Sequence, residues 1–207
     1  MPVISSCCSR AGLELSELDG IAVDTGPGLF TGLRVGVATA KALAFALGKR
    51  LVAVSSLDVL AWSLRHMEGT VAAVMDARRG QCFWAVYRSG DGHVQLLGEP
   101  AVDVPERVLE GLEKYRDAGA GRPGIVAVGD GALRYGAIFG GAIGVHLGDR
   151  ALAYPSPEGV LAMGEGGASR SEWLAPEHLR ATYLSDPDAN LSASRTGGPG
   201  DVGTDPW

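Results

Sequence analysis

A glycine-rich turn between a short apolar run and a long apolar segment constrains the fold of this chain most. The turn, residues 26–34 (GPGLFTGLR), follows the apolar run 20–24 and opens a segment that stays apolar until Gly48. This order predicts a β-strand that passes directly into a helix, as in α/β proteins. We expect Thr31 to cap a helix over residues 31–47 and Gly48 to end it.

Small residues recur every four positions along this predicted helix. Gly32, Gly36 and Ala40 are expected to form a bare stripe, because positions four apart lie on the same side of a helix. A stripe without bulky side chains lets another backbone approach closely. The residues alone leave open whether that backbone belongs to this chain or to a partner protein.

Composition and charge narrow the function classes. The chain has 207 residues, which allows one large domain or two lobes, and 46% of them are hydrophobic. Its net charge of −6 argues against a surface that binds phosphate backbones unaided. The three cysteines, two of them adjacent, favour a reducing compartment. Arg34 and Lys41 interrupt the longest apolar segment, so we expect no membrane span and a cytoplasmic protein.

The order of predicted elements suggests an internal duplication. After residue 68 the patterns predict the string strand–strand–strand–helix–strand–helix–strand–helix. The three opening strands are expected at 71–76, 81–87 and 94–97, followed by a helix capped by Asp103 and Glu106. A strand at 125–128, a helix at 132–139, a strand at 143–146 and a helix from Pro157 complete the string. In the second of these strands Cys82, Trp84 and Val86 alternate with Phe83, Ala85 and Tyr87.

The first part of the chain predicts the same string without its three opening strands. Its helix, strand, helix, strand and helix are expected at 2–12, 20–24, 31–47, 51–54 and from a capping box at Ser55 and Asp58. The sequence therefore predicts a duplicated βββαβαβα unit. We expect an incomplete N-terminal lobe over residues 1–67, a C-terminal lobe over 68–184 and a disordered tail over 185–207.

Three motifs, in this order, resemble those of the TsaB (YeaZ) family: residues 26–44 (GPGLFTGLRVGVATAKALA), 54–61 (VSSLDVLA) and 76–87 (DARRGQCFWAVY). The resemblance covers about residues 1–184. It implies the two-lobed fold of actin-like and Hsp70-like ATPases (the ASKHA fold), in agreement with the duplicated string. It also implies a role in making threonylcarbamoyladenosine beside the anticodon of tRNA, without catalysis, cofactor or metal of its own.

The resemblance also implies partners and a surface for them. Members of the family pair with the transferase subunit TsaD, and the ATPase TsaE joins them, so contact with tRNA is expected to be indirect. The pairing is attributed to the helix over 31–47 and the one before it. This gives the predicted partner-binding residues, which could also form a homodimer: Ile4, Cys8, Gly32, Leu33, Gly36, Val37 and Ala40. Arg34 and Lys41 are expected to flank this face and meet partner carboxylates.

The chain departs from the family at its start. Family members begin with a strand hairpin, a third strand and the first part of a helix, whereas residues 2–4 resemble the interior of that helix. We expect that the coding sequence continues upstream of Met1; a truncated chain is the alternative.

Two enzymatic alternatives stay open from the residues. Residues 26–32 could form a phosphate-binding loop of an ASKHA-type phosphotransferase, although the Lys-Ser/Thr of a P-loop is missing. A metalloprotease-like (glycoprotease) enzyme needs a helical pair of metal ligands about four residues apart. The histidines, at positions 66, 93, 146 and 178, lie further from one another than that.

The segment 76–80 (DARRG) also has two interpretations. Its two arginines could bind phosphate or tRNA, or they could be solvated side chains of a hairpin turn. In the second interpretation Gly80 supplies a positive φ and Asp76 bonds to amides of the turn.

Overall fold

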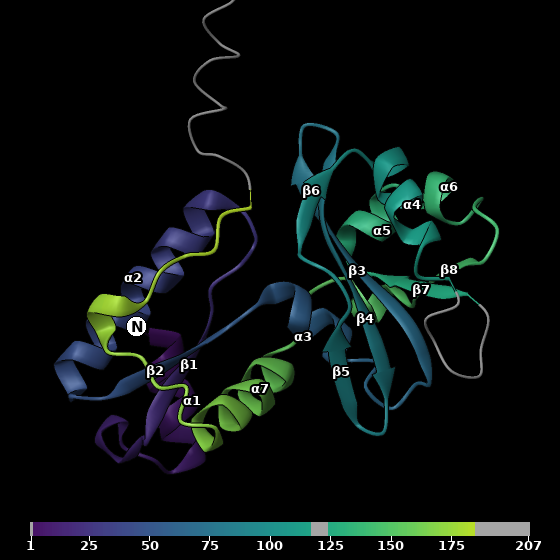
Figure 1. The fold of residues 1–207 in the computed structure, drawn as a ribbon. Helices are drawn as coiled ribbons and strands as arrows, with labels where there is room; N and C mark the ends of the chain where they lie inside the picture. The colour runs from purple at the N-terminus through teal and green to yellow at the C-terminus, as the bar shows by residue number, and fades with distance from the viewer. Residues whose placement is uncertain (1, 117–123, 185–207) are drawn as a thin grey trace, which may run out of the picture.

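The computed structural model describes residues 2–116 and 124–184, which form two β-sheets with helices on their faces (Figure 1). The tail predicted at 185–207 lies outside the described residues. The first part of the chain contains α1 (Pro2–Ala11), β1 (Gly20–Asp24), α2 (Phe30–Leu47), β2 (Arg50–Val54) and α3 (Ser56–Trp62), with a short 3-10 turn at Leu15–Glu17. Strands β1 and β2 pair in parallel, with Ile21 beside Leu51.

The second part of the chain forms a larger mixed sheet. It contains β3 (Gly69–Arg78), β4 (Gln81–Gly90), β5 (His93–Leu96), β6 (Ala101–Asp103), α4 (Pro105–Glu113), β7 (Ile125–Val128), α5 (Asp130–Arg134), α6 (Gly136–Phe139), β8 (Val145–Leu147) and α7 (Pro157–Ser169), with 3-10 turns at Arg150–Leu152 and Pro176–His178. The strand order is β5-β4-β3-β7-β8, and β6 also pairs with β4. The strands and the longer helices follow one another along the chain as predicted for the residues after 68; β6 is an additional strand that was not predicted.

Both faces of the larger sheet are buried, and successive side chains of β4 point alternately to one face and to the other. Cys82, Trp84 and Val86 lie in the cluster that α4, α5 and α6 cover. Ala85 and Tyr87 lie in the cluster on the opposite face, against Leu57, Leu60 and Ala61 of α3. The predicted period of two in this strand is therefore confirmed.

The smaller sheet lies between α2 and α7. Helix α2 packs on the face of Ile21, Val23 and Leu51. Helix α7 covers the other face, where a Cβ atom on Gly164 would lie 2.4 Å from Cβ of Ala22 and one on Gly167 would lie 2.6 Å from Val52. The glycines of α7 therefore let this helix approach the strands closely.

Helices α3 and α7 each pack on the sheet formed by the other part of the chain. Helix α3 precedes residue 68 but contacts β3, β4 and β5, whereas α7 contacts β1 and β2. The two helices also contact one another. The packing thus differs from the predicted lobes 1–67 and 68–184 at these two helices, because α3 covers strands that follow residue 68 and α7 covers strands that precede it. The lobe boundary itself stays a prediction.

Helix ends test the local predictions. Gly48 ends α2 in a left-handed conformation, with φ of 63°, and Ser55 Oγ accepts a hydrogen bond from the Asp58 amide at 3.5 Å, as expected. The prediction for Thr31 was wrong: α2 begins at Phe30, and Leu29 precedes it without a side-chain cap. Asp103 does not cap α4 either, since it belongs to β6 and accepts a hydrogen bond from Trp84 Nε1.

The helix predicted over 132–139 is two short helices. Tyr135 separates α5 from α6 with φ of −101° and ψ of 31°, outside the helical region. The predicted strand 143–146 shifts to Val145–Leu147, where it pairs with β7.

Candidate protein interface on helix α2

The inner face of α2 belongs to the core of this chain. Val37, Ala40 and Ala44 are buried, and Leu33 packs against them, together with Leu51 and Leu179. Leu33, Val37 and Ala40, predicted as partner-binding residues, thus face their own sheet, which corrects that prediction. Ala40 leaves the face of Gly32 because each step of four residues turns about 40° beyond a full circle. Leu33 and Val37 each lie about 100° round the helix from the glycine that precedes them, and therefore point to the same side as Ala40.

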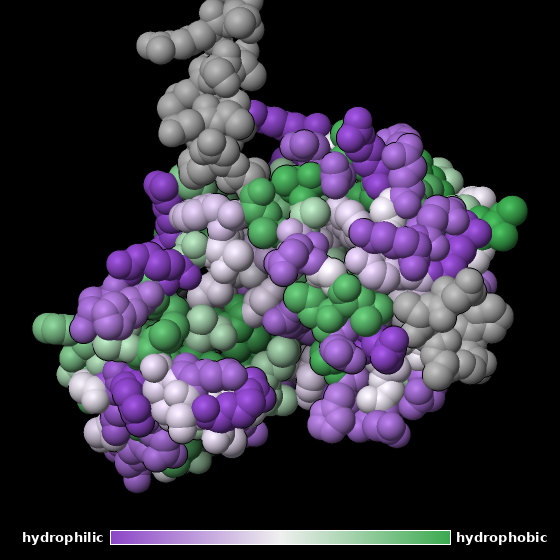
Figure 2. All heavy atoms as spheres, viewed as in Figure 1, coloured by the Kyte–Doolittle hydropathy of each residue, from purple (hydrophilic) through white to green (hydrophobic). Residues whose placement is uncertain are grey.

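The outer face of α2 is open and carries no charged side chain. Outside the backbone of α2 itself, a Cβ atom on Gly32 or Gly36 would meet no atom of residues 2–116 and 124–184 within 4 Å. Val35 is 61% exposed and Phe45 is 83% exposed. We call this surface the open face of α2; its exposed residues are Thr31, Gly32, Val35, Gly36, Ala38, Ala42, Phe45 and Ala46. Figure 2 shows hydrophobic atoms on the left-hand edge of the molecule, where α2 lies in Figure 1.

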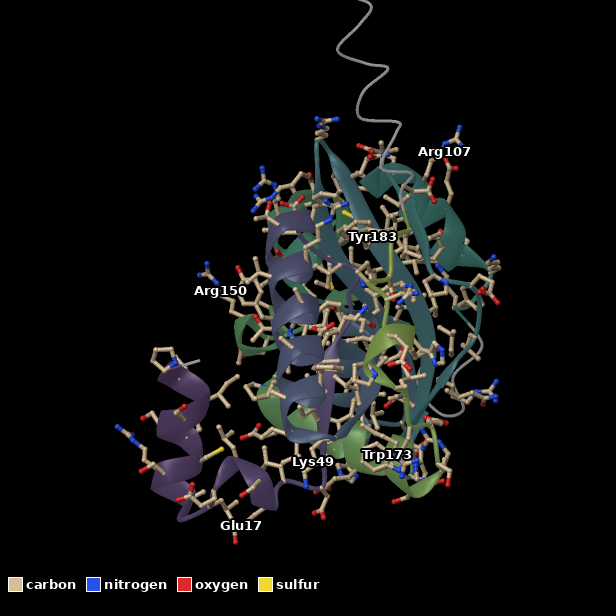
Figure 3. All side chains as sticks on the ribbon, turned by 90° about the vertical axis from the view of Figure 1, so that its left-hand side faces the viewer. Glu17, Lys49, Arg107, Arg150, Trp173 and Tyr183 are labelled. Atoms are coloured by element: carbon tan, nitrogen blue, oxygen red, sulfur yellow. The ribbon has the colours of Figure 1, made fainter. Side chains whose placement is uncertain are left out.

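Helix α1 contributes the two other predicted residues. Ile4 and Cys8 are half-buried, one turn apart, whereas Val3 and Cys7 on the same helix are exposed. No residue of α1 is fully buried. In Figure 3 this helix lies at the lower left of α2. Ile4 and Cys8 therefore share the less exposed side of α1, and their contact with a partner stays a prediction.

One flank of α2 is covered by residues 174–183, which we call the C-terminal strap. Leu174 exchanges two backbone hydrogen bonds with Leu51, of 2.9 and 2.7 Å. Leu179 is buried against α2, and its carbonyl oxygen accepts a hydrogen bond from Lys41 Nζ at 3.4 Å. Further along, the Thr182 amide donates to the Thr25 carbonyl at 2.7 Å. Sequence reasoning missed this strap because no local pattern marks its pairing with residues more than a hundred positions away.

The loop before α2 is closed by a carboxylate. Asp24 Oδ1 accepts hydrogen bonds from the Gly26 amide at 2.9 Å and from Ser56 Oγ at 2.6 Å. The Gly26–Pro27 peptide bond is cis, and both residues are buried. A phosphate-binding loop needs amides that point toward the anion, whereas here the Gly26 amide is occupied and a negative charge lies beside it. This geometry disfavours the phosphate-binding interpretation of residues 26–32.

The segment 76–80 forms a hairpin turn between β3 and β4. Arg79 and Gly80 have φ of 51° and 78°, as a type I′ turn requires at its two central positions. Asp76 accepts a hydrogen bond from the Arg78 amide at 3.0 Å. Its carboxylate also forms ion pairs with Arg78 at 3.4 Å and Arg134 at 3.6 Å. These contacts favour the structural interpretation of the motif.

Two further features bear on the enzymatic alternatives and on a membrane location. Within residues 2–116 and 124–184, no group of three or more His, Cys, Asp or Glu side chains could hold a metal ion. Over the same residues one helix, Phe30–Leu47, is long and apolar enough to cross a membrane by length and composition alone. This is α2, and its Arg34 and Lys41 bond to the C-terminal strap.

Comparisons with known proteins place the chain in a family. A family model described as "TsaD: tRNA N6-adenosine threonylcarbamoyltransferase" matches residues 1–178. The chain is 31% identical over 183 residues to the tRNA threonylcarbamoyladenosine biosynthesis protein TsaB of Bacillus subtilis, covering 87% of this chain and 77% of that protein. It is 35% identical over 189 residues to an uncharacterised protein of Mycobacterium leprae, covering 91% of this chain but only 44% of that protein.

A solved structure agrees with these relatives. The crystal structure of an uncharacterised Pseudomonas aeruginosa protein with similarity to peptidase YeaZ superposes with a TM-score of 0.75 at 31% identity, over 89% of this chain and 82% of that one. The match confirms the predicted fold class, the α/β fold of the actin-like ATPases. The chain therefore belongs to the TsaB (YeaZ) family, within the larger group of TsaD-like proteins.

Proposed function

We propose that this chain is a non-catalytic subunit of the machinery that makes threonylcarbamoyladenosine in tRNA, and that it pairs with a TsaD-like transferase. The names of its relatives support the pathway, since the Bacillus subtilis protein is a tRNA threonylcarbamoyladenosine biosynthesis protein. We further propose that the chain acts in the cytoplasm, that a TsaE-like ATPase joins the pair, and that tRNA contacts this chain only indirectly.

The observation that supports pairing is the open face of α2. An exposed helix face normally carries charged or polar side chains, whereas this one carries Val35, Phe45, two glycines and three alanines without a charge. Glycines in the middle of a helix lower its stability by about 1 kcal/mol each relative to alanine. Within the described part of the chain, Gly32 and Gly36 have no neighbour that would require them. Close approach of a partner backbone gives them a role.

The same face could instead pair two copies of this chain. Because a TsaD-like transferase is related to this chain, the two assemblies would use similar surfaces and compete. The residues that we propose at the interface are Ile4, Cys8, Gly32, Val35, Gly36 and Phe45; they comprise four of the predicted residues and two that the structure adds.

Co-purification with the transferase tests the proposal. The chain is mixed with the TsaD-like protein of the same organism, and the mass and dissociation constant of the complex are measured in solution. We expect a one-to-one complex, and Gly36→Leu should weaken it by about 1–3 kcal/mol because the added side chain separates the backbones. Ala137→Leu, at an exposed position of α6, is the matched control and should pair normally.

Two results would overturn the proposal. One is a Gly36→Leu chain that pairs as tightly as the unchanged protein. The other is synthesis of threonylcarbamoyladenosine, or transfer of a phosphoryl group from ATP, by the chain alone. The second result would favour the phosphotransferase alternative.

A further inference from the structure

Arg34 is held in place beside the open face of α2 by two aromatic side chains. Its guanidinium lies over the Phe30 ring, 3.5 Å from the ring centre. Its Nε donates a hydrogen bond of 3.3 Å to the hydroxyl of Tyr183 on the C-terminal strap. The rings of Phe30 and Tyr183 also contact one another, with centres 5.6 Å apart. Figure 3 shows Tyr183 beside the upper part of α2.

These contacts leave the two terminal nitrogens of Arg34 available. Among the described residues, neither nitrogen forms a hydrogen bond or an ion pair, and the side chain is exposed. Lys41, on the same flank, differs: the residue is half-buried, and its ammonium group donates to the Leu179 carbonyl oxygen. Of the two cations expected to meet a partner, Arg34 is the more exposed, and both of its terminal nitrogens are unbonded among the described residues.

An arginine oriented in this way suits a planar, two-oxygen acceptor. The guanidinium binds carboxylates through two parallel hydrogen bonds, and an arginine that is already immobilised loses less conformational freedom on binding. We propose that Arg34 binds an aspartate or glutamate side chain of the partner subunit at the edge of the open face, and so sets the register of pairing. This inference rests on the proposed function.

A protein carboxylate fits this position better than a nucleic-acid phosphate. Phosphate backbones are bound by several cations together, whereas the two other cations on this flank of α2, Lys41 and Arg180, already donate to the Leu179 carbonyl oxygen, in a chain of net charge −6. The adjoining surface is the apolar face of Val35 and Phe45, which matches a protein partner.

Four variants of the full chain test the inference by their dissociation constants with the transferase. Arg34→Gln should weaken pairing roughly 10-fold or more, and Arg34→Lys should recover only part of that loss, because a point charge cannot replace two parallel hydrogen bonds. Tyr183→Phe keeps the ring but removes the orienting hydroxyl, and should weaken pairing roughly 2- to 10-fold. Lys41→Gln removes the same charge from the same flank and should pair within about twofold of the unchanged protein.

Charge reversal identifies the partner residue. Arg34→Glu should abolish pairing, and reversal of one acidic residue of the transferase to arginine should restore it. Equal affinity of Arg34→Gln and the unchanged chain would overturn the inference, as would failure of every reversed carboxylate to restore pairing. Loss of tRNA binding by Arg34→Gln in a complex of unchanged affinity would assign the side chain to RNA instead. If the unchanged chain does not pair at all, the proposed function itself fails.

Discussion

The hydroxyl of Tyr87 donates a hydrogen bond of 2.7 Å to Oδ1 of Asp58. This bond connects β4 to the first turn of α3, and Tyr87 is almost completely buried. Burial raises the pKa of Asp58 above its ordinary value of 3.8, and the bond from Tyr87 opposes this rise only in part. Folding therefore shifts the titration of Asp58 toward the neutral acid, relative to the unfolded chain.

The raised pKa of Asp58 predicts a pH-dependent stability. Because the folded state holds this proton more tightly than the unfolded state, its contribution is fully present below about pH 4 and is lost as the pH rises through the raised pKa. Asp58→Asn removes the titration but keeps an acceptor for Tyr87. The free energy of unfolding is measured in urea for both chains. We expect the value for Asp58→Asn to rise relative to that of the unchanged chain as the pH increases from about 4 to about 8. A constant difference over this range would contradict the assignment.

Tyr87→Phe tests the same pair from the other side. The variant leaves the Asp58 carboxyl group without its donor, and we expect it to lower the free energy of unfolding by about 1–3 kcal/mol. The double variant, Asp58→Asn with Tyr87→Phe, measures the coupling between the two groups. If the losses of the single variants simply add, the hydrogen bond does not stabilise the fold.

Two glycine-to-alanine variants should change stability in opposite directions. Gly164→Ala places a methyl group 2.4 Å from Cβ of Ala22, so α7 must move and stability should fall by about 1–3 kcal/mol. Gly36→Ala adds a methyl group that meets no atom of another described segment within 4 Å, and it should raise stability by up to about 1 kcal/mol. Thermal unfolding checks both, and a loss for Gly36→Ala would show that the outer face of α2 is covered by this chain.

Phe45 should contribute to pairing without contributing to the fold. It is 83% exposed on α2, so Phe45→Glu should change the free energy of unfolding by less than about 0.5 kcal/mol. In a complex we expect it to raise the dissociation constant by the equivalent of about 2 kcal/mol, since buried aromatic anchors dominate interfaces. Ile143→Glu, at a position 84% exposed beyond α6, is the matched control. Equal weakening by both variants would indicate a general effect of charge.

The three cysteines should react with a thiol reagent at different rates. Cys7 is exposed and Cys8 is half-buried, so both should be labelled in the folded chain. Burial, with Asp76, Asp130 and Glu106 nearby, raises the pKa of Cys82 to about 12, and this thiol should react only after unfolding. If α1 joins the interface, adding the transferase should slow the labelling of Cys8. Unchanged labelling of Cys8 in the complex would remove α1 from the proposed surface.

Local signals in the sequence predicted the local structure well. Gly48 and Ser55 mark helix ends that the structure confirms, because caps depend on a few neighbouring backbone groups. The alternation in β4 likewise assigned each side chain to its layer. Thr31 failed as a cap because the N-cap position is Leu29, two residues earlier, within the variation expected at helix ends.

Contacts between distant segments were not predictable in this way. The close approach of α7 to the first sheet has one possible sequence signal, the glycines at 164 and 167, but the spacing of these glycines does not identify the strands that the helix covers. The C-terminal strap has no such signal. The open face of α2 could be placed only once the structure showed which of its residues pack on β1 and β2.

The exchange of α3 and α7 between the two sheets has a consequence for how the molecule comes apart. If the chain were cut after residue 67, the helix α3 or α7 in each fragment would no longer pack on the sheet that it covers. Each sheet would then have one face exposed to solvent. Neither fragment is an independent folding unit on these grounds, so heating should melt both sheets together in one cooperative step.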